Sequence, residues 1–217
     1  MHPAIYESVL DWIPSGARVL DLGTGDGAFL ERLVRAKHVA AEGVEKDPRL
    51  VARCIQRGLV AHQGNIAEGL DQYGDRTFDY ALLLGTFQEL ISPEEIVREA
   101  FRVAQRVIIA YSNFAHYRVR LDILLRGRTP VTQSLPQLWY RTTNLHFFST
   151  LDFAEFCRQM GVSGVRHAYV GSHGRVRLLP NLFAEEVVTL LESDRQPCAA
   201  SGGSGDLASG AAAGFIP

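Results

Sequence analysis

The chain has 217 residues, of which 47% are hydrophobic and 21% are charged. This composition is typical of a globular domain and excludes a disordered or collagen-like chain. The net charge of −2 argues against a dedicated nucleic-acid-binding protein, because such proteins are normally basic. No apolar run approaches the ~20 residues of a membrane-spanning helix, and no signal peptide is evident. We therefore expect a cytoplasmic protein that binds neither nucleic acid nor membrane.

The cysteines and the nucleophile motifs exclude several kinds of site. Cys54, Cys157 and Cys198 form no CxxC pair, so we expect reduced thiols that fill space. No cluster of His, Cys and Asp has the spacing of metal ligands, and we expect no metal. No G-x-S-x-G elbow is present, which argues against a hydrolase or acyltransferase nucleophile in this chain.

Composition divides the chain into a body and a tail. Residues 197–217 contain six alanines, five glycines and three serines, and Asp206 carries the only charge there. No helical or strand periodicity is present in this stretch. The sequence therefore predicts one folded domain over residues 1–193 and a flexible tail over residues 194–217.

Short apolar strands alternate with helical patterns in the first half of the body. Asp47 with Pro48 predicts a helix N-terminus, and Ser92 to Glu95 predicts a capping box. This alternation predicts a parallel sheet with helices on both faces, an α/β Rossmann-like architecture in three layers. The predicted strands are Arg18–Leu22, Val39–Glu45, Leu59–Gln63, Phe78–Leu84 and Arg106–Tyr111.

The regular alternation of predicted strands and helices ends after residue 112. A helical pattern covers about Ala115 to Leu125, and a helix capped by Ser149 or Thr150 ends before Gly161. Two last strands are predicted at Val165–Val170 and Ala184–Leu191, paired antiparallel, although the second also fits a helix. Glu185 and Glu186 are expected on the surface.

A glycine-rich turn follows the first predicted strand, at Gly23, Gly25 and Gly27. Such a turn brings backbone close to a ligand, and the helix that follows attracts an anionic group. Gly23, Gly25 and Ala28 also satisfy the relaxed dinucleotide pattern G-x-G-x-x-A, so a dinucleotide remains an alternative. A tight turn without any ligand is the other alternative.

Three polar residues at the ends of predicted strands favour a different ligand. Asp21 precedes the glycines, where a buried acid requires a partner such as an ammonium group and would repel a pyrophosphate. Glu45 ends the second strand and could bind ribose hydroxyls, and Asn65 follows the third and could accept from an adenine amino group. A ligand with an ammonium, a carboxylate, a ribose and an adenine is S-adenosylmethionine.

This D-x-G-x-G-x-G pattern, with an acid closing the second strand, resembles the class I S-adenosylmethionine-dependent methyltransferases. The resemblance implies a seven-stranded, mostly parallel sheet with an antiparallel last strand, and S-adenosylmethionine or S-adenosylhomocysteine as cofactor. By likeness, Asp21, Gly23 and Gly25 would hold the methionine end and Glu45 the ribose. Asn65 and Ile66 would contact the adenine, although many such proteins carry Asp where this chain has Asn65.

The chain is similar to the bacterial methionine-biosynthesis family MetW over about residues 9–192, and residues 113–153 are the most specific part of this similarity. The residues that carry this similarity are Ser112–Leu121, Leu124–Thr132, Leu135-Pro136, Trp139-Tyr140, Thr143–His146 and Thr150–Phe153. Thr24 departs from the Cys expected in the glycine loop. The resemblance implies a role in homoserine O-acylation together with a MetX-type homoserine O-acyltransferase, without implying methyl transfer.

Candidate catalytic bases are few. His116, Tyr117 and His146 could lie beyond the fourth and fifth strands, where an acceptor would bind in this fold. Alternatively, His116 caps the helix that it precedes, and His146 is a satisfied, half-buried side chain. Gln88 and Glu89 are expected on the surface or at a helix start. No Asn-Pro-Pro motif follows the fourth strand, so the usual pattern for amino-group methylation is missing.

An arginine cluster follows the fifth predicted strand and predicts a surface that binds a partner protein, because arginine and aromatic residues dominate binding hot spots. The alternative is a solvated helix face. The cluster consists of Arg118, Arg120, Arg126 and Arg128, with aromatic residues from Tyr111 to Phe148 nearby in sequence.

Two functions therefore stay open. The chain is either an accessory subunit of the acyltransferase or an active small-molecule methyltransferase.

Overall fold

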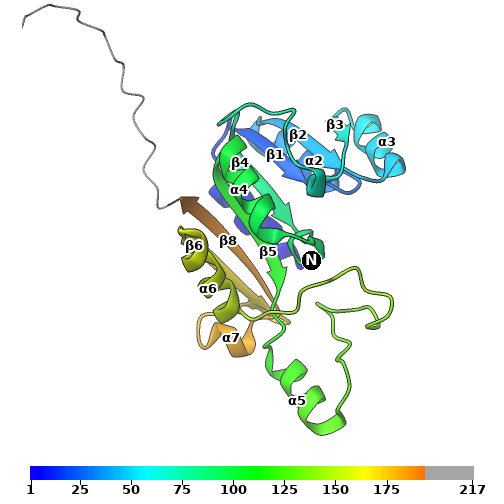
Figure 1. Ribbon diagram of the computed structural model, residues 1–217, viewed down its shortest axis with the longest axis vertical. Helices are drawn as coiled ribbons and strands as arrows, with labels where there is room; N and C mark the ends of the chain where they lie inside the picture. The colour runs from blue at the N-terminus through cyan, green and yellow to red at the C-terminus, as the bar shows by residue number, and fades with distance from the viewer. Residues whose placement is uncertain (194–217) are drawn as a thin grey trace, which may run out of the picture.

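The computed structural model describes residues 1–193. The predicted tail and Cys198 lie outside the described residues. In the first half, helices and strands alternate along the chain (Figure 1). Their bounds are α1 Pro3–Trp12, β1 Arg18–Leu22, α2 Ala28–Lys37, β2 Ala40–Glu45, α3 Pro48–Gln56, β3 Val60–Gln63, η1 Ile66–Glu68, β4 Phe78–Leu84, η2 Phe87–Glu89, α4 Pro93–Val103 and β5 Ala104–Ser112.

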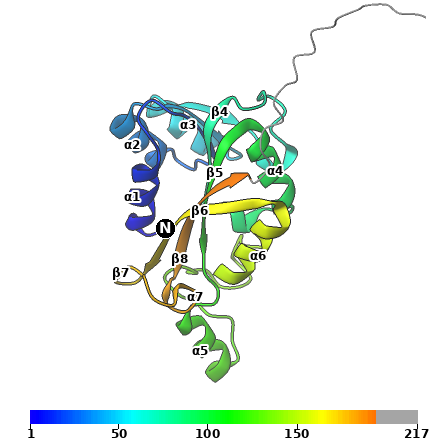
Figure 2. The ribbon, with the colours of Figure 1, turned by 90° about the vertical axis from the view of Figure 1, so that its left-hand side faces the viewer.

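The second half completes the sheet and adds a projecting helix. α5 extends away from the sheet at one end of the molecule (Figures 1 and 2). The elements are α5 Tyr117–Arg126, α6 Thr150–Met160, β6 Val162–Gly171, β7 Gly174–Arg175, α7 Pro180–Phe183 and β8 Glu186–Ser193. None of the helices among residues 1–193 is long and apolar enough to cross a membrane.

The sheet has the order β3-β2-β1-β4-β5-β8-β6-β7. β1 to β5 are parallel to one another, and β8 is antiparallel between β5 and β6. The predicted Rossmann-like α/β sheet with an antiparallel last strand is therefore confirmed. Its strand count is eight because the two-residue β7 adds a short edge to the seven predicted. The segment after Ala184 is a strand, which decides between the two alternatives that its apolar sequence allowed.

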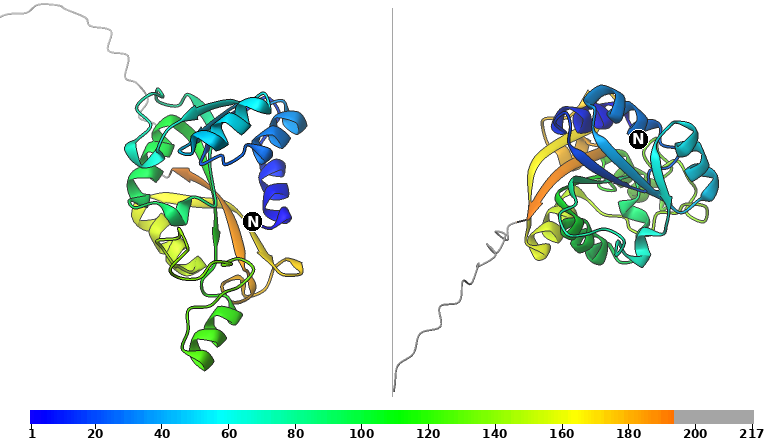
Figure 3. Two further views of the ribbon diagram at one scale, coloured as in Figure 1. Left: turned by 90° about the vertical axis from the view of Figure 1, so that its right-hand side faces the viewer. Right: turned by 90° about the horizontal axis from the view of Figure 1, so that it is seen from above.

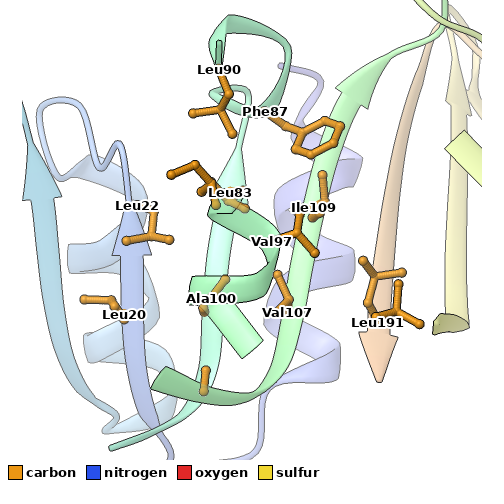
Figure 4. Packing of buried hydrophobic residues seen from close by; sticks show 14 of the residues in the cluster. Leu20, Leu22, Leu83, Phe87, Leu90, Val97, Ala100, Val107, Ile109 and Leu191 are labelled. Atoms are coloured by element: carbon orange, nitrogen blue, oxygen red, sulfur yellow. The ribbon is translucent and has the colours of Figure 1, made fainter. Parts of the chain in front are cut away.

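Both faces of the sheet are covered (Figure 3). One core contains side chains of α4 and α6, such as Val97 and Phe153, and alternate residues of the central strands (Figure 4). The other core contains side chains of α1 and α2, such as Ile5 and Leu33. Burial on both faces explains why β4 and β5 are nearly continuous apolar runs. Cys54 and Cys157 are buried and free, as predicted.

Side-chain caps define some of the helix ends. The Asp47 carboxylate accepts from Arg49 N at 2.8 Å, and Ser149 with Asp152 forms a capping box at α6. The predicted capping box at Ser92 is wrong, because its side chain accepts no bond from α4. Ser92 has ψ 75°, away from the extended conformation that aims a cap side chain at the first turn.

Candidate functional site

The glycine loop connects β1 to α2, and its conformation requires glycine. Gly23, Gly25 and Gly27 have φ of +83°, +60° and +76°, a region that L side chains rarely adopt. A Cβ at Gly23 would lie 2.1 Å from Thr86 Cγ2, so a larger residue would clash there. A Cβ at Gly25 would have no atom within 4 Å. The backbone at Gly25 is therefore open to a ligand.

Glu45, at the end of β2, holds this loop in place. One of its carboxylate oxygens accepts from Gly25 N at 2.9 Å, and the other accepts from Asp47 N at 3.1 Å. The Val44 carbonyl accepts from Gly23 N at 2.8 Å. Each carboxylate oxygen of Glu45 has a second lone pair, which leaves acceptor capacity for a ligand hydroxyl.

Asp21 is a buried carboxylate without a basic partner. Its residue is only 4% exposed, and no Lys, Arg or His among residues 1–193 forms an ion pair with it. The pKa of Asp21 is raised to about 6, chiefly because burial disfavours the charged form; Thr24 opposes this rise and the negative charge of Glu45 adds to it. A cationic ligand group beside Asp21 would supply the missing partner. The site therefore fits the ammonium of S-adenosylmethionine.

Asn65 and Ile66 follow β3 at the same edge of the sheet. The Asn65 side-chain oxygen accepts from Ala67 N at 3.1 Å and caps η1, and its amide donates to Glu68 Oε1 at 3.1 Å. Ile66 is partly buried against the core. Because β1, β2 and β3 are adjacent and parallel, the structure brings the Asp21 loop, Glu45 and Asn65 to one edge of the sheet.

A cavity of about 350 Å³ lies beyond the carboxyl ends of β4 and β5. Gly85, Tyr111, Ser112 and Trp139 are among its lining residues. Gln88 also lines the cavity and is buried in η2, so its surface alternative is wrong and its place in a short helix agrees with the other alternative. Its side-chain oxygen accepts from Ser112 N at 2.8 Å, which ties η2 to β5 and explains the burial of a polar side chain.

The two candidate histidines do not line this cavity. His116 is buried at the start of α5, and its side chain does not cap that helix. Its Nε2 lies 3.9 Å from Glu185 Oε1, and burial lowers the pKa of His116. The half-buried His146 bonds the Leu90 carbonyl through Nε2 at 2.8 Å. This agrees with the alternative that His146 is a satisfied side chain.

Glu185 is buried, so its predicted surface position is wrong. Ser172 Oγ donates to Glu185 Oε1 at 2.6 Å, and Arg118 Nη1 lies 3.7 Å from the same oxygen. These partners compensate the burial of the carboxylate. The cluster joins the start of α5 to the segment that leads into β8.

Two residues contact or face the glycine loop in ways that no motif predicts. Burial raises the pKa of Tyr6 on α1, and the nearby charges of Glu186, Asp21 and Asp26 raise it further. Thr86 follows β4, and its hydroxyl donates to the Leu22 carbonyl at 3.0 Å. Neither has a local motif, because tertiary packing alone brings them to the glycine loop.

Comparison with known proteins identifies the family. The sequence profile of the family described as "Methionine biosynthesis protein MetW" matches residues 4–191. The chain belongs to the MetW family. The bifunctional methionine biosynthesis protein MetXA/MetW of Rhodopirellula baltica is 30% identical to this MetW chain over 180 residues, which are 74% of the chain. The match covers 29% of that relative, so the chain spans less than a third of its length.

Solved structures share the fold of this MetW chain. A SAM-dependent methyltransferase of Thermotoga maritima has a TM-score of 0.64 at 20% identity, with 88% of each chain covered. One from Archaeoglobus fulgidus has a TM-score of 0.65 at 13% identity, covering 88% of this chain and 92% of that one. The [4+2]-cyclase SpnF reaches 0.64 at 16% identity, covering 87% and 80%. Because a cyclase is among them, the fold alone does not establish methyl transfer.

Proposed function

We propose that this MetW chain is a cytoplasmic accessory subunit that binds S-adenosylmethionine or S-adenosylhomocysteine and supports homoserine O-acylation by a MetX-type acyltransferase. The observation that carries the proposal is the relative from Rhodopirellula baltica, in which MetXA and MetW are named as one bifunctional protein. Two activities joined in one chain support physical association of the corresponding separate proteins.

The glycine-loop site supports the cofactor part of the proposal. Asp21 would bind the ammonium, and the backbone of Gly23 and Gly25 would contact the methionine end. Glu45 would accept from the ribose hydroxyls with its remaining lone pairs, and Asn65 with Ile66 would contact the adenine. The buried charge of Asp21 and the open space at Gly25 are the features of this chain that fit such a ligand.

An active methyltransferase is the second candidate, and the 350 Å³ cavity favours it because a small acceptor could bind there. When bound, S-adenosylmethionine would supply an electrophilic methyl group. The lining residues include no histidine or lysine, and His116 and His146 are held elsewhere. The lining does include the carboxylates of Glu89 and Glu186, so the chain could position an acceptor, exclude water and accept a proton at this cavity. The accessory role remains the first candidate because it is the fused relative that supports it.

The partner would contact the region after β5. Arg118, Arg120, Arg126 and Arg128 belong to α5 or follow it, and Trp139 and Tyr140 are exposed aromatic residues in the loop beyond. Arginine and large aromatic side chains are the types that contribute most to binding free energy when an interface covers them.

Calorimetric titration with S-adenosylmethionine and with S-adenosylhomocysteine tests the cofactor site. The wild-type chain should bind, and Asp21→Ala should lose binding because the ammonium loses its counter-charge. Asp26→Ala is the matched control: Asp26 belongs to the same loop, but its carboxylate is partly exposed and pairs with Arg57 at 3.0 Å. Absence of binding to the wild-type chain would contradict the cofactor part of the proposal.

Co-purification with the MetX-type acyltransferase of the same genome tests the partner part. The two proteins should elute together, and the acyltransferase should be more active in the complex. Separate elution together with an unchanged rate would contradict the accessory role and would favour the methyltransferase alternative if the cofactor binds.

A further inference from the structure

α5 projects from the molecule and carries exposed apolar side chains as well as arginines. It lies beyond the end of the sheet, on the opposite side from β2, β3 and α3 (Figures 1 and 3). Val119 is its one buried residue, whereas Leu124 is 78% exposed and Leu125 is 76% exposed. Large exposed apolar side chains that gather on one element mark an interaction surface in a globular protein.

The first turn of α5 contacts α7 and the segment that leads into β8. The Tyr117 ring lies 5.9 Å from the Phe183 ring of α7, and Arg118 Nη1 lies 3.7 Å from the buried Glu185 carboxylate. At the far end of α5, Gly127 ends the helix in a left-handed conformation. The contacts at the first turn set the direction in which the tip of α5 projects.

A groove accompanies the exposed leucines. A cavity of about 380 Å³ lies between α5 and the loop that follows it, and its lining includes Leu121, Leu125, Arg126 and Val131. Leu121 and Val131 are also exposed. An apolar side chain of a partner could enter this groove while Leu124 contacts the surface around it.

The net positive charge of residues 117–128 indicates the sign of the charge that a partner surface must carry. Residues 117–128 contain four arginines and one aspartate, whereas the whole chain has a net charge of −2. In a two-fold dimer of this chain the same basic patch would face itself, and like charges across an interface oppose association. An acidic surface on a different protein would be complementary.

Most of the arginines are already engaged within the chain. Arg118 contacts Glu185, Arg120 Nε donates to the Ala115 carbonyl, and Arg126 forms an ion pair with Asp122 at 2.9 Å. Arg128 forms no ion pair within residues 1–193. The apolar tip, more than the arginine cluster, is therefore the part of this region that lacks an intramolecular partner.

We propose that the tip of α5, with Leu121, Leu124 and Leu125, docks into an apolar groove with an acidic rim on the MetX-type acyltransferase. This proposal rests on the accessory role proposed above. It assigns the leucines as the anchors of the interface and the arginines as the charges that orient it.

The test is co-purification of the acyltransferase of the same genome with three forms of the full chain. Wild type should form the complex. Combined Leu124→Asp and Leu125→Asp should weaken it ~10-fold or more, because acids would replace the anchors and face an acidic rim. Ile55→Asp is the matched control, since Ile55 is 59% exposed on α3, far from α5 (Figure 1), and should bind as wild type does.

The possible outcomes of this co-purification separate the α5 interface from the accessory role. Undiminished binding of the leucine variant, with its circular dichroism and melting temperature equal to those of wild type, would overturn the α5 interface and leave the accessory role intact. Absence of a complex with wild type would overturn both. A wild-type dimer in light scattering that the leucine variant dissociates would assign α5 to self-association and overturn the acyltransferase as its occupant.

Discussion

Replacement of Asp21 by Asn should make the cofactor-free protein more stable. The pKa of Asp21 rises from 3.8 to about 6 in the folded protein because burial disfavours the charged form. The folded state therefore binds the proton more tightly than the unfolded state, and stability falls as the pH rises from 3.8 through 6. At ~1.4 kcal/mol per pH unit, the ionised carboxylate costs about 3 kcal/mol at pH 7, and Asn removes this cost.

Urea denaturation of the cofactor-free wild type and Asp21→Asn at several pH values measures this effect. At pH 7 the variant should have the larger free energy of unfolding, by up to about 3 kcal/mol, and at pH 5 the difference should fall to about half. Asp26→Asn, at a partly exposed carboxylate of the same loop that pairs with Arg57, should show no such gain. A variant less stable than wild type at pH 7 would show that Asp21 is not a destabilising buried charge without a basic partner.

Three further results are expected. S-adenosylmethionine binding by calorimetry should weaken as the pH falls below about 6, ~10-fold per pH unit, because protonated Asp21 cannot pair with an ammonium; a flat affinity from pH 7.5 to 5 would contradict this. In urea denaturation, Gly23→Ala should lower the free energy of unfolding by several kcal/mol, since its Cβ would meet Thr86 Cγ2 at 2.1 Å. Gly16→Ala is the control and should cost about 1 kcal/mol, because Gly16 also has a positive φ but has open space around it. Equal costs would refute the clash. Gln88→Ala should cost ~1–3 kcal/mol by leaving a buried backbone N–H unpaired, and a neutral result in the same assay would exclude that role.

The parallel half of the fold could be predicted because several levels of the sequence agree there. Each apolar run from β1 to β5 is followed by turn residues or a helix start, and Asp47 with Pro48 begins α3 as predicted. The glycine loop could also be predicted, because Gly23, Gly25 and Gly27 have the backbone conformations that favour glycine.

The other features of the fold and the site could not be predicted, because they depend on tertiary contacts between residues that are distant in the sequence. Ala184 to Leu191 lacks alternation because β8 is buried between β5 and β6, so strand and helix patterns look alike there. Gln88 and Glu185 are polar residues whose burial is compensated by distant partners, Ser112 and Ser172. A residue type alone predicts a surface position for both.

The accessory role that we propose for this MetW chain is support of an acyltransferase. The most direct measurement is the steady-state rate of homoserine acylation by the MetX-type enzyme of the same genome as the chain is titrated into the reaction. The rate should rise and then saturate as the complex fills. A rate that stays constant across the titration would contradict the accessory role.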